Sequence, residues 1–272
     1  MARPLWLVKL IKKTFPNRFL VAKLTRWPVI GPLLDHLLFE GDDLVYLPKS
    51  QVLSIHQPLE RTQEMVLPAQ VVDHFIEKAN VHWIMNACIC REAEQCEDYP
   101  RDLGCLFLGE AALGINPKLG RRVTKEEALE HVRRCRAAGL VHLIGRNKLD
   151  TVWLGVSPGE KLLTICNCCP CCCLWRVLPQ IEPGIGAKVS RLPGVIVTVS
   201  ERCTGCGTCT QDVCFVNAIQ LVDDRAAIHD ACRGCGRCVS VCPEGAITMT
   251  MDNEPEVARE LIERISGLVD VQ

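Results

Sequence analysis

Residues 197–252 read VTVSERCTGCGTCTQDVCFVNAIQLVDDRAAIHDACRGCGRCVSVCPEGAITMTMD and contain two related runs of four cysteines: Cys203, Cys206, Cys209 and Cys214, then Cys232, Cys235, Cys238 and Cys242. The second run has the spacing C-x2-C-x2-C-x3-C and is followed by Pro243, and each run ends in Ala-Ile. In such runs, two-residue gaps let three thiolates surround one iron–sulfur cluster, while the fourth cysteine reaches another cluster. The stretch is therefore an internal duplication of a cluster-binding sequence.

This pattern resembles that of bacterial two-cluster ferredoxins. The resemblance implies two [4Fe-4S] clusters, one held by Cys203, Cys206, Cys209 and Cys242 and the other by Cys232, Cys235, Cys238 and Cys214. The first run departs from the family pattern, because four residues rather than three precede Cys214 and Phe215 replaces the usual proline. The gap C-x2-C is also a zinc spacing, but closely packed triplets with an exchanged fourth cysteine disfavour a pair of zinc sites.

The composition restricts the class of protein. The chain has 272 residues, a net charge of −1 and 19 cysteines, which are bunched in metal-ligand spacings rather than spread as in a disulfide framework. We find no signal-peptide pattern and no apolar run long enough to cross a membrane. Because cluster-binding thiolates must stay reduced, we expect a cytoplasmic protein of an anaerobe, and the charge balance gives no sign of a nucleic-acid partner.

The first 34 residues carry seven basic side chains and no acidic one: Arg3, Lys9, Lys12, Lys13, Arg18, Lys23 and Arg26. Apolar residues recur between them at helical spacing, as at Leu7, Leu10 and Ile11. A basic amphipathic helix of this kind is typical of proteins that lie on an anionic membrane surface. The alternative is an arm that packs on the protein's own core or on a partner subunit.

The middle of the chain predicts a small α+β scaffold. Residues 41–67 are expected to form strands and turns, and a helix with one apolar face (Val71, Val72, Phe75 and Ile76) should follow. Thr124 and Glu127 predict a capping box ahead of a helix that ends at Gly139. Strands are expected at 140–144, at 151–156 and from Lys161 onward, with 145–150 as a turn.

This scaffold presents a second set of candidate metal ligands: Cys88, Cys90, Cys96, Cys105, Cys166, Cys168, Cys169, Cys171 and Cys172. Together they suffice for one or two additional iron–sulfur clusters, with Cys171 and Cys173 as the members that could stay free. The motifs C-x-C-R and I-C-N-C-C-x-C-C-C resemble the Cys-rich amino-terminal domain of a group of anaerobe proteins of the 4Fe-4S ferredoxin type, over roughly residues 70–250. The adjacent cysteine pairs are also similar to the CCG domains of heterodisulfide reductases, although the full CCG spacing is absent.

Two neighbouring residues have simpler interpretations. Cys135 lies inside the helix that follows Thr124, so we expect a small buried side chain rather than a ligand. Arg91 follows Cys90 directly and could donate to a cluster, but an ion pair with Glu92, Glu94 or Asp98 is the default expectation.

The predicted organisation has five parts: a basic amphipathic arm (1–40), a Cys-rich iron–sulfur domain (41–177), a linker (178–194), a two-cluster ferredoxin-like module (195–252) and a carboxy-terminal helix (253–272) that caps the module. The first hypothesis is an electron-transfer protein that works with redox partner proteins or as a subunit of a redox complex. The alternative is a reductase with an open cluster in the Cys-rich domain, and a third is a metal-handling factor. No acid–base pair, nucleophilic triad or phosphate-binding loop is recognisable, so a carrier is favoured over a stand-alone enzyme.

Overall fold

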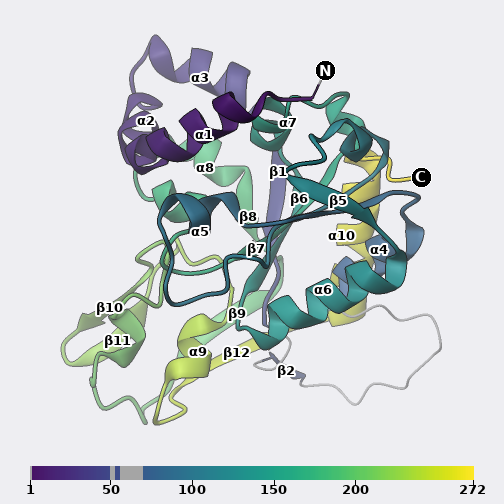
Figure 1. Cartoon of the computed structure of the whole chain (residues 1–272). Helices are drawn as coiled ribbons and strands as arrows, with labels where there is room; N and C mark the ends of the chain where they lie inside the picture. Colours follow the sequence, from purple (N-terminus) through teal and green to yellow (C-terminus); the bar gives the residue numbers. More distant parts are fainter. Residues whose placement is uncertain (1, 50–52, 56–69) are drawn as a thin grey trace.

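The computed structural model describes residues 2–49, 53–55 and 70–272. Residues 56–67, part of the stretch expected to form strands and turns, lie outside the described residues. At the centre is a sheet of seven strands, in the order β5 (Gly120–Val123), β3 (His82–Met85), β4 (Leu106–Leu108), β7 (Leu163–Cys168), β6 (Val141–Arg146), β1 (Asp43–Tyr46) and β8 (Val189–Arg191) (Figure 1). Neighbouring strands are antiparallel except β1 and β8. With helices packed around it, this is the α+β class that the sequence predicted.

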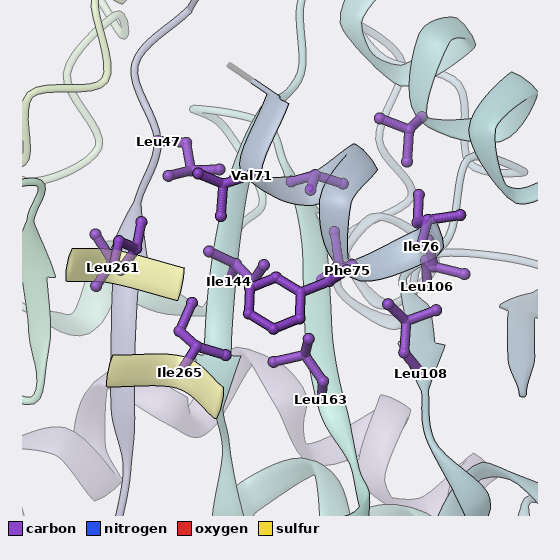
Figure 2. Packing of buried hydrophobic residues seen from close by; sticks show 14 of the residues in the cluster. Leu47, Val71, Phe75, Ile76, Leu106, Leu108, Ile144, Leu163, Leu261 and Ile265 are labelled. Carbon is purple, nitrogen blue, oxygen red and sulfur yellow. The ribbon is translucent and has the colours of Figure 1, made fainter. Parts of the chain in front are cut away.

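One face of the sheet is covered by α4 (Val71–Lys78), α6 (Lys125–Ala137) and α10 (Glu254–Leu268), whose apolar sides share a core with the strands. Figure 2 shows Phe75 of α4 between Ile144 and Leu163 of the sheet. The predicted apolar face of α4 is confirmed, because all four of its residues are buried. The hydrophobic effect on these side chains is what holds the helices to the sheet.

The carboxy-terminal helix α10 requires a correction. We expected it to cap the ferredoxin-like module, but Leu261 and Ile265 pack in the large core beside Ile144 (Figure 2). Met249 and Met251 of β12 (Ile247–Met251) belong to the same core. The helix therefore joins the module to the seven-stranded sheet instead of closing the module alone.

Local sequence signals correctly predict α6 but not α7 (Lys148–Leu154), which replaces the strand expected at 151–156. At the start of α6, both hydrogen bonds of the predicted capping box between Thr124 and Glu127 are present. The β-branched and aromatic residues of 151–156 suggested a strand. The first turns of α7 are instead stabilised by a hydrogen bond from the Trp153 indole to the Asp150 carboxylate (2.6 Å), and Gly155 ends the helix in the left-handed conformation.

Residues 178–194 were expected to be a linker, yet they contain α8 (Pro183–Ala187) and β8. The side chain of Glu182 accepts a hydrogen bond from the backbone N–H of Ile185 (2.9 Å) and so caps α8. Strand β8 then pairs with β1, with Leu44 opposite Val189. This segment is therefore part of the large sheet, whereas the domain boundaries themselves stay a prediction.

The carboxy-terminal cysteine runs lie in a smaller unit. Strand β9 (Val195–Val199) pairs antiparallel with β12, and β2 (Leu53–Ile55) adds a third, parallel strand. A separate hairpin is formed by β10 (Ile219–Val222) and β11 (Arg225–Ile228). A short helix begins two residues after the second cysteine of each run: η6 (Thr208–Thr210) after Cys206 and α9 (Arg237–Val241) after Cys235. The two halves of the duplication thus form similar local structures.

The amino-terminal arm consists of α1 (Leu5–Thr14), η1 (Phe15–Asn17), α2 (Arg18–Leu24) and α3 (Ile30–Leu38), gathered at one end of the molecule (Figure 1). Two of its basic side chains form ion pairs with acids of the Cys-rich domain: Lys12 with Glu92 and Arg18 with Glu94. Both glutamates lie at the end of α5 (Ile89–Ala93). The inner side of the arm is therefore docked on the chain's own Cys-rich domain. None of the described helices is long and apolar enough to cross a membrane.

Asp42, next to β1, makes the stability of the fold depend on pH. One carboxylate oxygen accepts a hydrogen bond from the backbone N–H of Lys148 (2.6 Å), and the other has no hydrogen-bond partner among the described residues. Burial raises the pKa of Asp42 from 3.8 to about 7. The folded chain therefore binds a proton that the unfolded chain releases between these pH values, so the free energy of unfolding falls as pH rises through this window.

We expect Asp42→Asn to remove that loss, so that the variant gains stability over the unaltered chain by up to about 1.4 kcal/mol per pH unit within the window. The measurement is urea unfolding without oxygen at pH 4.5 and pH 7.5, followed by far-ultraviolet circular dichroism. Asp252→Asn, at an exposed carboxylate, is the matched control. Parallel pH dependence in all three proteins would contradict the assignment.

Candidate metal centres

The cysteines of the Cys-rich domain meet because of how three strands of the large sheet pair. Since β4 runs antiparallel to both β3 and β7, the end of β3, the start of β4 and the end of β7 lie at one edge of the sheet. Cys88 follows β3 and Cys105 directly precedes β4. Cys166 and Cys168 are among the last three residues of strand β7. Segments far apart in the sequence therefore deliver thiols to the same edge.

Four of these cysteines form a compact set that we name the tight quartet: Cys96, Cys169, Cys171 and Cys172. Their sulfur atoms all lie within 4.8 Å of one another. The Sγ atom of Cys171 is 3.5 Å from that of Cys96 and 3.5 Å from that of Cys172. Three of the four side chains are buried, and Cys171 is half-buried. The sequence predicted all four as ligands but could not separate them from the rest.

Six other cysteines, which we name the cavity group, line a cavity of about 470 Å³: Cys88, Cys90, Cys105, Cys166, Cys168 and Cys173. Cys169 of the tight quartet also borders the cavity. The opposite wall is formed by the amino-terminal arm, with Ile11, Phe15 and Ala22 among its apolar side chains. The structure therefore divides the candidate ligands of this domain into a closed set and a set that faces an open space.

Thiol contacts within the cavity group divide the protons unevenly: hydrogen bonds from neighbouring thiols lower the pKa of Cys88 and Cys168, and the same contacts raise the pKa of Cys90, Cys166 and Cys173. The Sγ atoms of Cys105 and Cys166 are 3.7 Å apart. Hydrogen bonds from the thiols of Cys166 and Cys173 hold the pKa of Cys168 well below its usual value. Cys173, which the sequence left open as a residue that could stay free, lines the same cavity and contacts Cys168.

Arg91 is a fully buried charge between the two cysteine sets. Its guanidinium donates to the backbone carbonyl of Asn167 (2.8 Å) and to that of Leu103, and its Nε has no partner among the described residues. Burial by itself would lower the pKa of Arg91, but the thiolates of Cys88 and Cys169 raise it, so the side chain stays positive. The expected ion pair with a neighbouring acid is wrong for Glu92 and Glu94, because these bind Lys12 and Arg18 of the arm.

The eight cysteines of the carboxy-terminal unit gather in two sets. One small hollow is lined by Cys203, Cys206, Cys209 and Cys242, and a second by Cys214, Cys232, Cys235 and Cys238. Each set takes three cysteines from one run and one from the other. These are the sets that the ferredoxin resemblance implies, and their role as cluster ligands stays a prediction.

The two exchanged cysteines have matching surroundings. The backbone N–H of Ala218 donates to the Sγ of Cys214 (3.2 Å), and that of Ala246 donates to the Sγ of Cys242 (3.3 Å). The Ala-Ile pair that ends each run in the sequence therefore supplies the same hydrogen bond in both halves. Backbone N–H groups that point at a ligand sulfur stabilise its negative charge and raise the reduction potential of a bound cluster.

The first run departs from the ferredoxin pattern where it meets the Cys-rich domain. Phe215, at the position of the usual proline, is buried and packs on Tyr46 at the end of β1, with ring centroids 4.8 Å apart. The Tyr46 hydroxyl in turn lies 3.8 Å from the sulfur atoms of both Cys168 and Cys173. The altered loop therefore connects the second cysteine set of the carboxy-terminal unit to the cavity group.

Two polar residues at these sites had no signal in the sequence. Arg237, buried between Cys235 and Cys238, donates to the backbone carbonyl of Cys168 across the contact between the two units. Asp150 lines the cavity and accepts hydrogen bonds from Asn147 (2.7 Å) and Thr164 (2.9 Å), while burial raises its pKa to about 6. Asp150 lies where a turn was expected, so only the three-dimensional fold reveals its position.

Comparison with known proteins gives one partial match. Residues 210–252 match a family described as the LdpA Fe-S cluster-binding domain, a segment that includes Cys214 and the whole second run. No match was found among curated proteins or solved structures. This match and the clustered cysteines together identify the chain as an iron–sulfur protein.

Proposed function

We propose that the chain is an electron-transfer protein. In this proposal the two cysteine sets of the carboxy-terminal unit each hold a [4Fe-4S] cluster, and the cavity group holds at least one further cluster. The spacing of the two runs, the exchange of one cysteine between them and the paired N–H···S hydrogen bonds support the first two clusters. The concentration of six thiols around one cavity supports the third.

The observation that carries the proposal is the contact between the two units through Phe215 and Tyr46. It links the set that contains Cys235 to Cys168 and Cys173 of the cavity group through van der Waals contacts and a buried hydroxyl. Close, dry contact of this kind is what electron transfer between neighbouring centres needs. A protein whose clusters did not exchange electrons with one another would not require this contact between the two units.

The other set offers an entrance for electrons from a redox partner protein. Cys206 is exposed, whereas Cys209 of the same set is buried. A cluster in this set would therefore approach the surface, where a partner could dock. We infer a sequence in which electrons enter at the set with Cys206, pass to the set with Cys235 and reach the cavity group.

Substitution of Cys235 tests this order. We expect Cys235→Ala to lose about four irons and four sulfides from a total of about twelve of each. Because the intermediate centre is missing, the cavity-group cluster should be reduced at least tenfold more slowly, while the cluster next to Cys206 is reduced as before. The measurements are iron and acid-labile sulfide per chain and freeze-quenched paramagnetic resonance, all without oxygen.

The matched control for this experiment is Cys135→Ala. Cys135 is buried in α6 and belongs neither to the cavity group nor to the tight quartet. It should leave iron, sulfide and reduction rates unchanged. Unchanged iron in Cys235→Ala, or equally fast reduction of all clusters, would contradict the proposal.

A second candidate function is a reductase with an open cluster in the cavity group. The specific observation in its favour is the cavity itself, because about 470 Å³ lies in the range of small-molecule sites and one wall is made of thiols. An iron that faces this space could bind a small substrate, with Asp150 as a buried acid at the cavity wall.

Carbon monoxide is a suitable probe of an open iron in the reduced protein. The reductase predicts that carbon monoxide shifts the paramagnetic resonance signal of the cavity-group cluster and leaves the other two signals unchanged. Ala22→Phe, at a buried position that lines the cavity, should block the shift. Leu20→Phe on the exposed side of α2 is the control and should not. No shift in the unaltered protein would leave the carrier as the only function supported.

We further propose that the outer side of the arm contacts an anionic membrane surface, with the chain peripheral on the inner face. Exposed apolar side chains concentrate there, namely Trp6, Leu10, Leu20, Trp27, Val29, Leu33 and Leu37. Leu33 and Leu37 lie four residues apart on one side of α3, and Val29, the residue just before the helix, continues the same spacing. Lys9, Lys13 and Lys23 are exposed among these helices, in addition to the paired Lys12 and Arg18.

Binding to vesicles of phosphatidylglycerol tests this proposal. Each lysine near an anionic surface contributes about 1 kcal/mol, so the triple change Lys9→Gln, Lys13→Gln and Lys23→Gln should weaken binding on the order of 100-fold. Lys78→Gln with Lys118→Gln, at exposed positions outside the arm, is the control and should bind normally. Cosedimentation measures both, and an unaltered chain that stays in the supernatant would refute membrane contact.

A further inference from the structure

The tight quartet differs from every other group of cysteines in the described parts of the chain. It is the one group of three or more potential metal ligands there whose ligand atoms all lie within 4.8 Å of one another. The two cysteine sets of the carboxy-terminal unit have the sequence spacing of [4Fe-4S] ligands, and their sulfur atoms are spread more widely than those of the quartet. We propose that the tight quartet binds a single zinc ion and not an iron–sulfur cluster.

The separation of the sulfur atoms favours one ion. With Zn–S bonds of about 2.3 Å, four sulfurs at the corners of a tetrahedron are about 3.8 Å apart. Two separations in the quartet, Cys171 to Cys96 and Cys171 to Cys172, are both 3.5 Å. In a [4Fe-4S] cluster each cysteine binds a different corner of the cube, so the four sulfurs must be farther apart than around one ion. The cavity group also has a close pair, Cys105 and Cys166 (3.7 Å), but among the described residues no three of its sulfurs lie within 4.8 Å of one another.

The chemistry of the donor set favours zinc. Four cysteines in a buried, tetrahedral arrangement are typical of structural zinc sites, which have no position open to water or substrate. A zinc ion with four thiolates has a net charge of −2, and the buried guanidinium of Arg91 next to Cys169 offsets part of it. The backbone N–H of Cys172 also donates to the Cys169 sulfur (3.4 Å).

Two further arginines fix the backbone of the ligands. The side chain of Arg101 donates to the carbonyl oxygen of Cys96 (2.8 Å), and that of Arg176 donates to the carbonyl oxygen of Cys171. The first bond lies within the loop after α5 and the second within the segment after β7, so each fixes the backbone of its own ligand segment. A zinc ion at this place joins the two segments covalently and leaves the cavity group as the cluster site of this domain.

Metal analysis of the full chain tests the assignment. After purification without oxygen and dialysis against EDTA, the unaltered protein should contain about one zinc per chain in addition to its iron. Cys171→Ser should reduce zinc to below about a tenth of an equivalent, with iron and sulfide unchanged. Cys171→His should retain zinc, because three cysteines and one histidine are a common zinc set. Cys135→Ser, next to the quartet but outside it, should retain zinc as well.

Two results would overturn the proposal. One is an unaltered protein with no zinc, a measurement that does not depend on how any variant folds. The other is a loss of iron and sulfide from Cys171→Ser with no change in zinc, which would place a cluster in the quartet. Neither result bears on the clusters of the carboxy-terminal unit, because the iron count of Cys235→Ala tests these separately.

Discussion

The antiparallel register of β3, β4 and β7 is the constraint on which the candidate metal centres of the Cys-rich domain depend. It sets Ile84, Leu106 and Ile165 in one row across the sheet, and the cysteines follow directly beyond this row. A shift of one residue in either pairing would turn alternate side chains to the opposite face and separate the thiols. The large core of α4, α6 and α10 holds this register, because it covers the strands on which the thiols are placed. Packing far from the cysteines is therefore a condition for bringing these thiols together.

Buried positive charge is the second requirement of this arrangement. Thiolates in a dry interior are costly unless cations or hydrogen-bond donors face them. Arg91 and Arg237 are both buried and donate to backbone carbonyls in or beside the cysteine-rich segments. A planar guanidinium can make these bonds and still present its charge to sulfur, which a lysine ammonium could not do from one position. The same two side chains thus serve the fold and the electrostatics of the sites.

Features that depend on short stretches of sequence could be predicted, and features that depend on long-range pairing could not. The capping box of Thr124 and the apolar face of α4 are local, and both are confirmed. The division of the middle cysteines is not local, because Cys96 joins residues 169–172 only through the fold. For the same reason Phe215 looked like a defect in a motif, although it is a contact with Tyr46. The prediction of a linker at 178–194 was wrong because β8 gains its hydrogen bonds from β1, which lies far away in the sequence.

The amino-terminal arm lines one side of the cavity, and this position bears on the order in which the protein assembles. The arm that covers the cavity group is synthesised first, but Glu92, Glu94 and the cysteines beneath it are made later. Until then Lys12 and Arg18 lack these two carboxylates. If the cavity group holds the proposed cluster, that cluster would be inserted beneath the arm before Arg18 and Lys12 reach their carboxylates. On the proposed function, docking of the amino-terminal arm would follow maturation of that centre, and the two ion pairs would form last.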